Sequence, residues 1–374
     1  MEVWTDGTLV VHACEKTSAV RVLRDFAVFG EARAEHDLGW KTPLAVDVEA
    51  DRIWAGNRLQ EFRLSDVSPV ATHEDRVWRL AGLGGGRLAA ILPPVDGVCR
   101  LAVGKPGDWE HEVVLDDLGE AAPGLAMTDE RPVSHAVGGD PTLTATGHGL
   151  VVADGQRGVV AHFSPDLELL GLWHAGGVDE TELTGYAAAR GVLVTARWAG
   201  RDSRVGWLTS EGPRHLRDSY GAYAMPAGDD QLWLVGNLEV ALLEHTGEPI
   251  ATARSPHHLI KAAHASDQWC VMGTTAAVGI AAADEGVLVR TVGVGGIVGV
   301  IAIFDRRVDL SDVEIWRYSM SHGYSTHKGD DNRQHVIVGE VRPGGERDLE
   351  QVLRAAGAIS VEILEPVRDR PCCS

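Results

Sequence analysis

The sequence predicts an all-β protein built from seven copies of one four-stranded unit, followed by a small α/β appendage. Three observations indicate this class. Apolar and polar residues alternate over short stretches, as in half-buried strands, and turn residues interrupt them about every 8–12 residues. One order of residues recurs along the chain: an acidic turn, a short strand, a glycine, an alternating strand and another polar turn. Most copies follow one another at close to the 40–50-residue spacing typical of propeller blades.

The clearest copies are residues 50–66, 229–248 and 266–286, and in each the first strand after the acidic turn carries a tryptophan. Residues 147–173 and 189–212 repeat this order, and residues 6–25 and 84–109 are looser copies. Each copy has one central apolar residue: Leu9, Ile53, Leu88, Leu150, Leu193, Leu232 and Trp269. Consecutive central residues lie 35–44 residues apart, except for 62 between Leu88 and Leu150. A β-sandwich explains the alternation but not seven copies, so the pattern favours a seven-bladed β-propeller.

The long step contains an insertion, residues 115–140, whose proline, glycine and acidic residues predict a surface loop. The next copy contains the stretch GLVVADGQRGVVAHFSPD (149–166), which resembles the blades of NHL-type propellers and their lactonase and lyase relatives. These families include protein-binding scaffolds, hydrolases and lyases, so the resemblance implies a propeller without selecting one function. The lactonase-type enzymes hold a central metal with Glu, Asn and Asp, and no such set maps onto this chain.

The pattern changes near residue 295, which divides the chain into a propeller (1–294) and a C-terminal appendage (295–374). Residues 313–321, 335–341 and 359–364 are predicted strands, and residues 344–357 are a predicted amphipathic helix that ends at Gly357. This appendage either caps the propeller or completes it as an eighth blade. The N-terminal MEVWT is expected to pair with a late strand and so close the ring.

Composition and charge exclude several classes of function. The 374 residues carry a net charge of −20, and no run of Lys and Arg forms a basic patch, so we expect no nucleic-acid partner. No apolar run reaches the length of a membrane span, so we expect no membrane partner either. The five cysteines form no C-x-x-C pair and the N-terminus has no secretory signature, which predicts a cytoplasmic protein.

Three histidines occur within SPHHLIKAAH (255–264). If residues 259–265 form the inner strand of a blade, His258 and His264 are about 20 Å apart at about 3.3 Å per residue, too far to share a metal. His258 and Lys261 would then lie at the entry of the strand, near the mouth of the central channel. They are either ordinary turn residues or contacts for a ligand.

A second cluster lies in SHGYSTHKGDD (321–331). A loop that brings His322, His327 and Asp330 together would suit Zn²⁺ or another divalent metal, because two imidazoles and a carboxylate are a common ligand set. The same residues would also suit catalysis, with a His–Asp pair as general base and Tyr324 as acid. The alternative is a polar, glycine-rich loop between two strands. The identity of any cofactor stays open, with a divalent metal as the candidate.

Other polar and aromatic residues are expected at the blade entries, around one mouth of the channel. With His258 and Lys261, the candidates for binding a ligand are Trp40, Arg76, Tyr186 and Tyr223, and Thr142 and Thr184 occupy similar positions. Aromatic and cationic groups around one mouth suit a protein, a peptide or a small molecule. Two functions are consistent with the sequence: a scaffold that binds a protein or peptide at this face, or a lyase, cyclase or hydrolase that acts at the channel mouth, with or without a metal.

Overall fold

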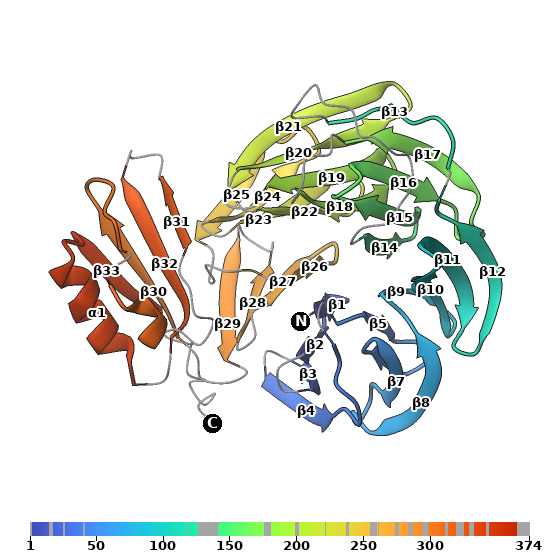
Figure 1. Ribbon diagram of the computed structural model, residues 1–374, viewed down its shortest axis with the longest axis horizontal. Helices are drawn as coiled ribbons and strands as arrows, with labels where there is room; N and C mark the ends of the chain where they lie inside the picture. Colours follow the sequence, from blue (N-terminus) through green and yellow to red (C-terminus); the bar gives the residue numbers. More distant parts are fainter. Residues whose placement is uncertain are drawn as a thin grey trace.

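The computed structural model describes the chain in segments. They are residues 2–14, 18–24, 27–39, 42–116, 118–125, 141–175, 181–198, 202–220, 222–236, 239–254, 260, 262–273, 277–282, 287–293, 298–310, 313–318, 325–328, 333–341 and 344–364. Within these residues the chain is a β-propeller of seven antiparallel sheets, followed by an eighth sheet with one α-helix (Figure 1). The predicted all-β class, the seven blades of four strands and the small α/β appendage are confirmed.

Each blade is a run of four consecutive strands, in which every strand pairs with the next. The strands of the first four blades are β1 (Glu2–Thr5), β2 (Leu9–Cys14), β3 (Ala19–Arg24) and β4 (Ala27–Arg33); β5 (Leu44–Asp47), β6 (Arg52–Ala55), β7 (Arg58–Arg63) and β8 (Pro69–Arg76); β9 (Arg79–Gly84), β10 (Arg87–Val95), β11 (Val98–Lys105) and β12 (Asp108–Val114); β14 (Thr142–Thr146), β15 (Gly149–Asp154), β16 (Val159–Phe163) and β17 (Leu169–His174). Those of the last three are β18 (Thr181–Ala188), β19 (Gly191–Trp198), β20 (Asp202–Thr209) and β21 (Gly212–Tyr220); β22 (Tyr223–Ala227), β23 (Gln231–Val235), β24 (Glu239–Glu244) and β25 (Pro249–Arg254); β26 (Ala262–Ala265), β27 (Trp269–Gly273), β28 (Ala277–Ala282) and β29 (Leu288–Gly293).

The first strand of each blade is the innermost one, and these strands contact one another in a ring: β1, β5, β9, β14, β18, β22, β26 and β1 again. All seven central apolar residues of the sequence repeat fall on the second strand of a blade. The repeat therefore located the same strand in every blade, because that strand lies between two other strands and is buried over nearly its whole length, as β15 is.

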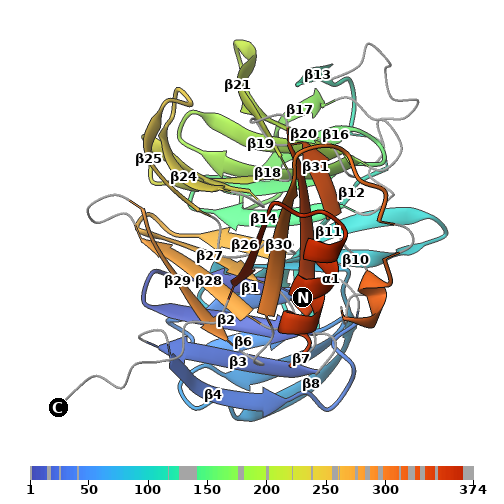
Figure 2. The ribbon, with the colours of Figure 1, turned by 90° about the vertical axis from the view of Figure 1, so that its left-hand side faces the viewer.

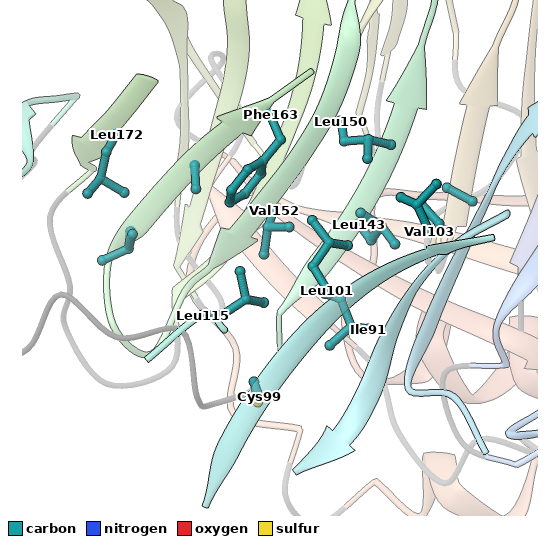
Figure 3. Close-up of a cluster of buried hydrophobic side chains, with 14 residues drawn as sticks. Ile91, Cys99, Leu101, Val103, Leu115, Leu143, Leu150, Val152, Phe163 and Leu172 are labelled. Carbon is teal, nitrogen blue, oxygen red and sulfur yellow. The ribbon is translucent and has the colours of Figure 1, made fainter. Parts of the chain in front are cut away.

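The hydrophobic core is a ring of clusters, each lying between two adjacent blades. Figure 3 shows the cluster between the third and fourth blades, in which Ile91 and Leu101 face Leu150, Val152 and Phe163. Similar clusters fill the other six junctions. Burial of apolar side chains between blades, at about 25 cal/mol per Å², is thus what holds the blades together.

The ring closes by side-chain packing. Val3 and Leu23 of the first blade pack against Val271 and Ile280 of the last blade, while β1 pairs with β2 inside its own blade. The expectation that the N-terminal strand would join a late strand was therefore wrong. Each terminal blade already has four strands of contiguous sequence, so no exchanged strand is needed.

The insertion after the third blade contributes a strand of its own. Within residues 118–125, β13 (Ala122–Pro123) pairs in parallel with β17 at the outer edge of the fourth blade, and Leu125 is buried between the fourth and fifth blades. The prediction of a surface loop for residues 115–140 was therefore incomplete, because residues 122–125 pack against the fourth blade. Residues 126–140 lie outside the described residues.

The eighth sheet has the order β31-β32-β30-β33, from β30 (Val298–Phe304), β31 (Ser325–Lys328), β32 (Gln334–Val341) and β33 (Ser360–Leu364). Helix α1 (Glu346–Ala355) covers one face, and Leu349 and Leu353 pack against Val300 and Phe304. Figures 1 and 2 show this sheet outside the ring of blades. The strand predicted at 313–321 was wrong in its described part, where Ile315–Arg317 forms a 3-10 helix.

Candidate functional site

A cavity of about 600 Å³ occupies the centre of the propeller. Residues from all seven innermost strands line it, so it belongs to the central channel. The lining residues that bear polar or aromatic side chains are Glu2, Trp4, Thr42, Arg79, Thr142, Thr144, Gln156, Glu182, Thr184, Tyr186, Arg197, Tyr223 and His264. They come mostly from the first residues of these strands, so the cavity lies toward the end of the channel where the inner strands begin.

An arginine near this end is fixed by two neighbours. One Nη of Arg197, on β19, lies 3.2 Å from a carboxylate oxygen of Glu182 on β18, and it donates a hydrogen bond of 2.8 Å to the hydroxyl of Tyr223. The guanidinium also lies 5.4 Å from the centre of the Tyr223 ring, a cation–π distance. The side chain of Glu182 is 55% exposed, so the carboxylate lies at the opening of the cavity and neutralises Arg197 there.

Two tyrosines project into the cavity from different blades. Tyr186 on β18 packs against the cluster between the sixth and seventh blades, and Tyr223 packs against the same cluster. Burial raises the pKa of both phenols, and the Glu2 carboxylate raises them further. Arg197 partly opposes this shift at Tyr223. Both hydroxyls are therefore protonated at neutral pH and can donate hydrogen bonds.

His264 on β26 is held in one tautomer. The backbone N–H of Thr5 donates a 3.3 Å hydrogen bond to its Nδ1, so the proton of the neutral ring is assigned to Nε2. The imidazole lies beside the indole of Trp4, with ring centres 6.0 Å apart and planes inclined by 37°. Burial lowers the pKa of His264 to about 4, so the ring is neutral at pH 7.

The structure brings together some of the residues that the sequence suggested for binding. Tyr186 and Tyr223 line the cavity, and so do Thr142 and Thr184. Arg76 does not: it lies at the end of β8, opposite Arg58, and is exposed. Its placement at the channel was wrong, because β8 is the fourth and outermost strand of its blade rather than a blade entry.

The remaining candidates lie outside the described residues or away from the channel. Those outside the described residues are Trp40, His258, Lys261, His322, Tyr324 and Asp330. His327 is placed by its backbone alone: it lies on β31 of the eighth sheet, opposite His335 on β32. The single loop imagined for 321–331 was therefore wrong, because residues 325–328 form a strand.

Sequence reasoning missed Glu2, Trp4, Arg79, Arg197 and His264 as cavity residues. One signal was available for two of them: Trp4 and His264 each lie five residues before the central apolar residue of their copy, Leu9 and Trp269. Equivalent positions in a repeat occupy equivalent places in the ring, so two aromatic residues at this position indicate a shared wall.

The described residues contain no group of three or more His, Cys, Asp or Glu placed to hold a metal ion. Because the side chains of His322 and His327 are not among those described, the divalent metal stays a prediction. In the same part of the chain, no helix is both long and apolar enough to cross a bilayer.

The fold and the cavity define the class of protein: a seven-bladed β-propeller with a ligand-sized cavity in its central channel. No protein-family model and no curated protein matches the chain, so no particular family is assigned. Several solved structures are similar in overall shape. BamB from Moraxella catarrhalis is 15% identical over 77% of this chain and 83% of that chain, with a TM-score of 0.43. KlHsv2 with loop 6CD replaced by a Gly-Ser linker is 10% identical over 78% of this chain and 96% of that chain, with a TM-score of 0.47. The dihydro-heme d1 dehydrogenase NirN in complex with DHE is 15% identical over 77% of this chain and 64% of that chain, with a TM-score of 0.45. The blade count comes from the strand topology of this chain itself.

Proposed function

We propose that this protein is a binding module and that a short peptide segment of its partner enters the central channel. The observation that carries this proposal is the cavity of about 600 Å³ lined by all seven blades. Its volume falls within the range of about 300–1,000 Å³ that is usual for ligand sites. Glu182 and Arg197 are partly exposed at its opening, so a ligand has access from solvent.

The chemistry of the wall supports a peptide. Aromatic faces from Trp4, Tyr186 and Tyr223 suit apolar side chains, while hydroxyl and imidazole groups suit a polar backbone. At the opening, the Glu182 carboxylate and the Arg197 guanidinium are already paired with each other. The opening therefore has no strong preference for a positively or a negatively charged ligand. The NHL-like character of residues 149–166 is consistent with a protein-binding role and forms part of this proposal.

The test is affinity selection of pooled short peptides, read by mass spectrometry, on the wild type and on a channel-filled variant. Ala263→Phe places a ring in the cavity wall, and Ala145→Phe does so from another blade in case the first variant folds poorly. Ala71→Phe, exposed on the outer strand β8, is the matched control. We expect peptides retained by the wild type and Ala71→Phe to be lost from a folded channel variant. Equal retention by all variants would contradict a channel site.

Elemental analysis of the untagged protein tests the competing enzyme hypothesis of a metal-assisted site at His322 and His327. A binding module predicts no stoichiometric metal. One equivalent of zinc or another divalent metal, lost in His327→Ala, would instead favour that hypothesis. Chemical turnover of a retained peptide would favour an enzyme without requiring a metal.

A further inference from the structure

The two ends of the central channel differ. The cavity is lined by the first residues of the innermost strands and, deeper, by Tyr186, the sixth residue of β18. At the opposite end, called the far end below, the innermost strands finish and a turn joins the first and second strands of each blade. All seven turns belong to the described part of the chain, and none of their residues lines the cavity. The cavity therefore occupies only one end of the channel.

The far end is filled where four of the innermost strands finish. The last residues of β1, β5, β18 and β22 are each at most 9% exposed, and they are Thr5, Asp47, Ala188 and Ala227. The carboxylate of Asp47 also accepts a hydrogen bond of 2.7 Å from the backbone N–H of Gly86, in the turn of the third blade. An open channel at this level would leave the inner edges of these strands in contact with water. Their burial shows that the channel is not open there.

Polar side chains hold three turns of the far end together. Nε2 of His148, in the turn of the fourth blade, lies 3.6 Å from a carboxylate oxygen of Asp229, in the turn of the sixth blade. Arg190, in the turn of the fifth blade, donates to the backbone carbonyl of Asp229 and to the carboxylate of Asp230. The fourth and sixth blades are not neighbours in the ring, so this contact requires their turns to converge around that of the fifth blade. The far end is therefore narrow on this side.

The other end is open to solvent. Gln156 lines the cavity and is exposed, in the turn after β15. The end of β15 lies beside the start of β14, because Thr142 pairs with Ala153. Glu182, the second residue of β18, also lines the cavity, and its side chain is 55% exposed. A ligand can therefore enter where the innermost strands begin, but it meets buried residues before it reaches the far end.

We propose, resting on the channel site proposed above, that the channel is a dead end that binds one end of the partner's chain. The segment enters past Gln156 and Glu182 and stops before the far end. A segment that passed through the channel would need an exit at the far end, which is filled. A loop would bring two backbones, about 4.8 Å apart, through one opening, and every buried amide of both would need a hydrogen-bond partner. A single chain end brings the fewest such groups.

The first test presents random heptapeptides on a carrier protein in three forms. One form has a free N-terminus, one has a free C-terminus, and one is joined to the carrier at both ends. Each form is selected on the wild type and on the channel-filled variant Ala263→Phe. We expect the wild type to enrich peptides from at least one of the free-ended forms and none from the form joined at both ends. This enrichment should be lost on Ala263→Phe.

The second test asks from which end a selected peptide enters. Gln156→Trp places a large ring at the opening, and Asp267→Trp places the same ring at an exposed position in the far-end turn of the seventh blade. Both positions lie in exposed turns, and equal melting temperatures would show that both variants fold. We expect Gln156→Trp to weaken binding by about tenfold or more and Asp267→Trp to change it by less than about twofold.

The outcomes separate this inference from the proposed function. Equal, channel-dependent enrichment of the form joined at both ends would overturn the dead-end inference and leave the binding module in place. The same holds if Asp267→Trp weakens binding as much as Gln156→Trp, or if neither variant weakens it. If no form is enriched in a channel-dependent way, both proposals are overturned together.

Discussion

His264 shows how a single residue depends on distant parts of the chain. Its Nδ1 accepts from the N–H of Thr5, which is 259 residues away, and its ring lies against Trp4. The hydrogen bond fixes the tautomer, and burial fixes the neutral charge state. Removal of this residue therefore changes both the junction between the first and last blades and the chemistry of the cavity.

This burial predicts a dependence of stability on pH. The pKa of His264 falls from 6.5 to about 4 on folding, so between these values the unfolded chain binds a proton that the folded chain does not. Stability is then unaffected above pH 6.5 and decreases as pH falls toward 4. We expect the melting temperature of His264→Asn to fall less steeply over this range than that of the wild type. The control is His215→Asn, at an exposed site. If the melting temperatures of His264→Asn and the wild type fall in parallel as pH decreases, this explanation is wrong.

At the scale of elements, β14 and β18 are joined by side chains instead of a backbone ladder. The hydroxyls of Thr142, Thr144 and Thr146 donate to the carbonyls of Leu183, Gly185 and Ala187, every second residue along each strand. The alternation of a strand places all three threonines on the side facing the next blade. These bonds give three carbonyls of the innermost strand β18 side-chain partners on β14, and so they tie two walls of the cavity together.

Replacing Thr144 with Val tests this contact. Valine keeps the shape but removes the donor, which leaves the Gly185 carbonyl without its partner. We expect a loss of about 1–3 kcal/mol in the free energy of unfolding, measured by urea denaturation. Thr72→Val, at an exposed hydroxyl bonded to Glu35, should change stability by no more than about 0.5 kcal/mol. Equal effects at the two sites would show that the inter-blade bond contributes nothing specific.

At the scale of the whole molecule, the residues that the structure describes form separate cores in the propeller and in the eighth sheet. The cluster at the ring closure joins the first and last blades, and the cluster under α1 contains only residues from 300 onward. Two units without a shared core should lose stability independently when one is disturbed.

Matched leucine-to-alanine variants test this independence. Leu23 is 1% exposed at the ring closure and Leu353 is fully buried under α1. Each substitution should cost about 2–5 kcal/mol locally. By hydrogen exchange, Leu23→Ala should reduce protection in the first and last blades while sparing the eighth sheet, and Leu353→Ala should do the reverse. Loss of protection throughout the chain in both variants would show one cooperative unit.

The blades of this protein could be located from its residue pattern alone. The alternation of a strand is a property of neighbouring residues, so seven copies with central residues from Leu9 to Trp269 could be located from sequence alone. The tertiary structure decided the cavity and the ring closure. Trp4, Tyr186 and His264 come from blades one, five and seven, and no local pattern states that they share a wall. Their convergence arises because apolar clusters between blades bend the chain into a closed ring, and that packing fixes which inner strands face one another.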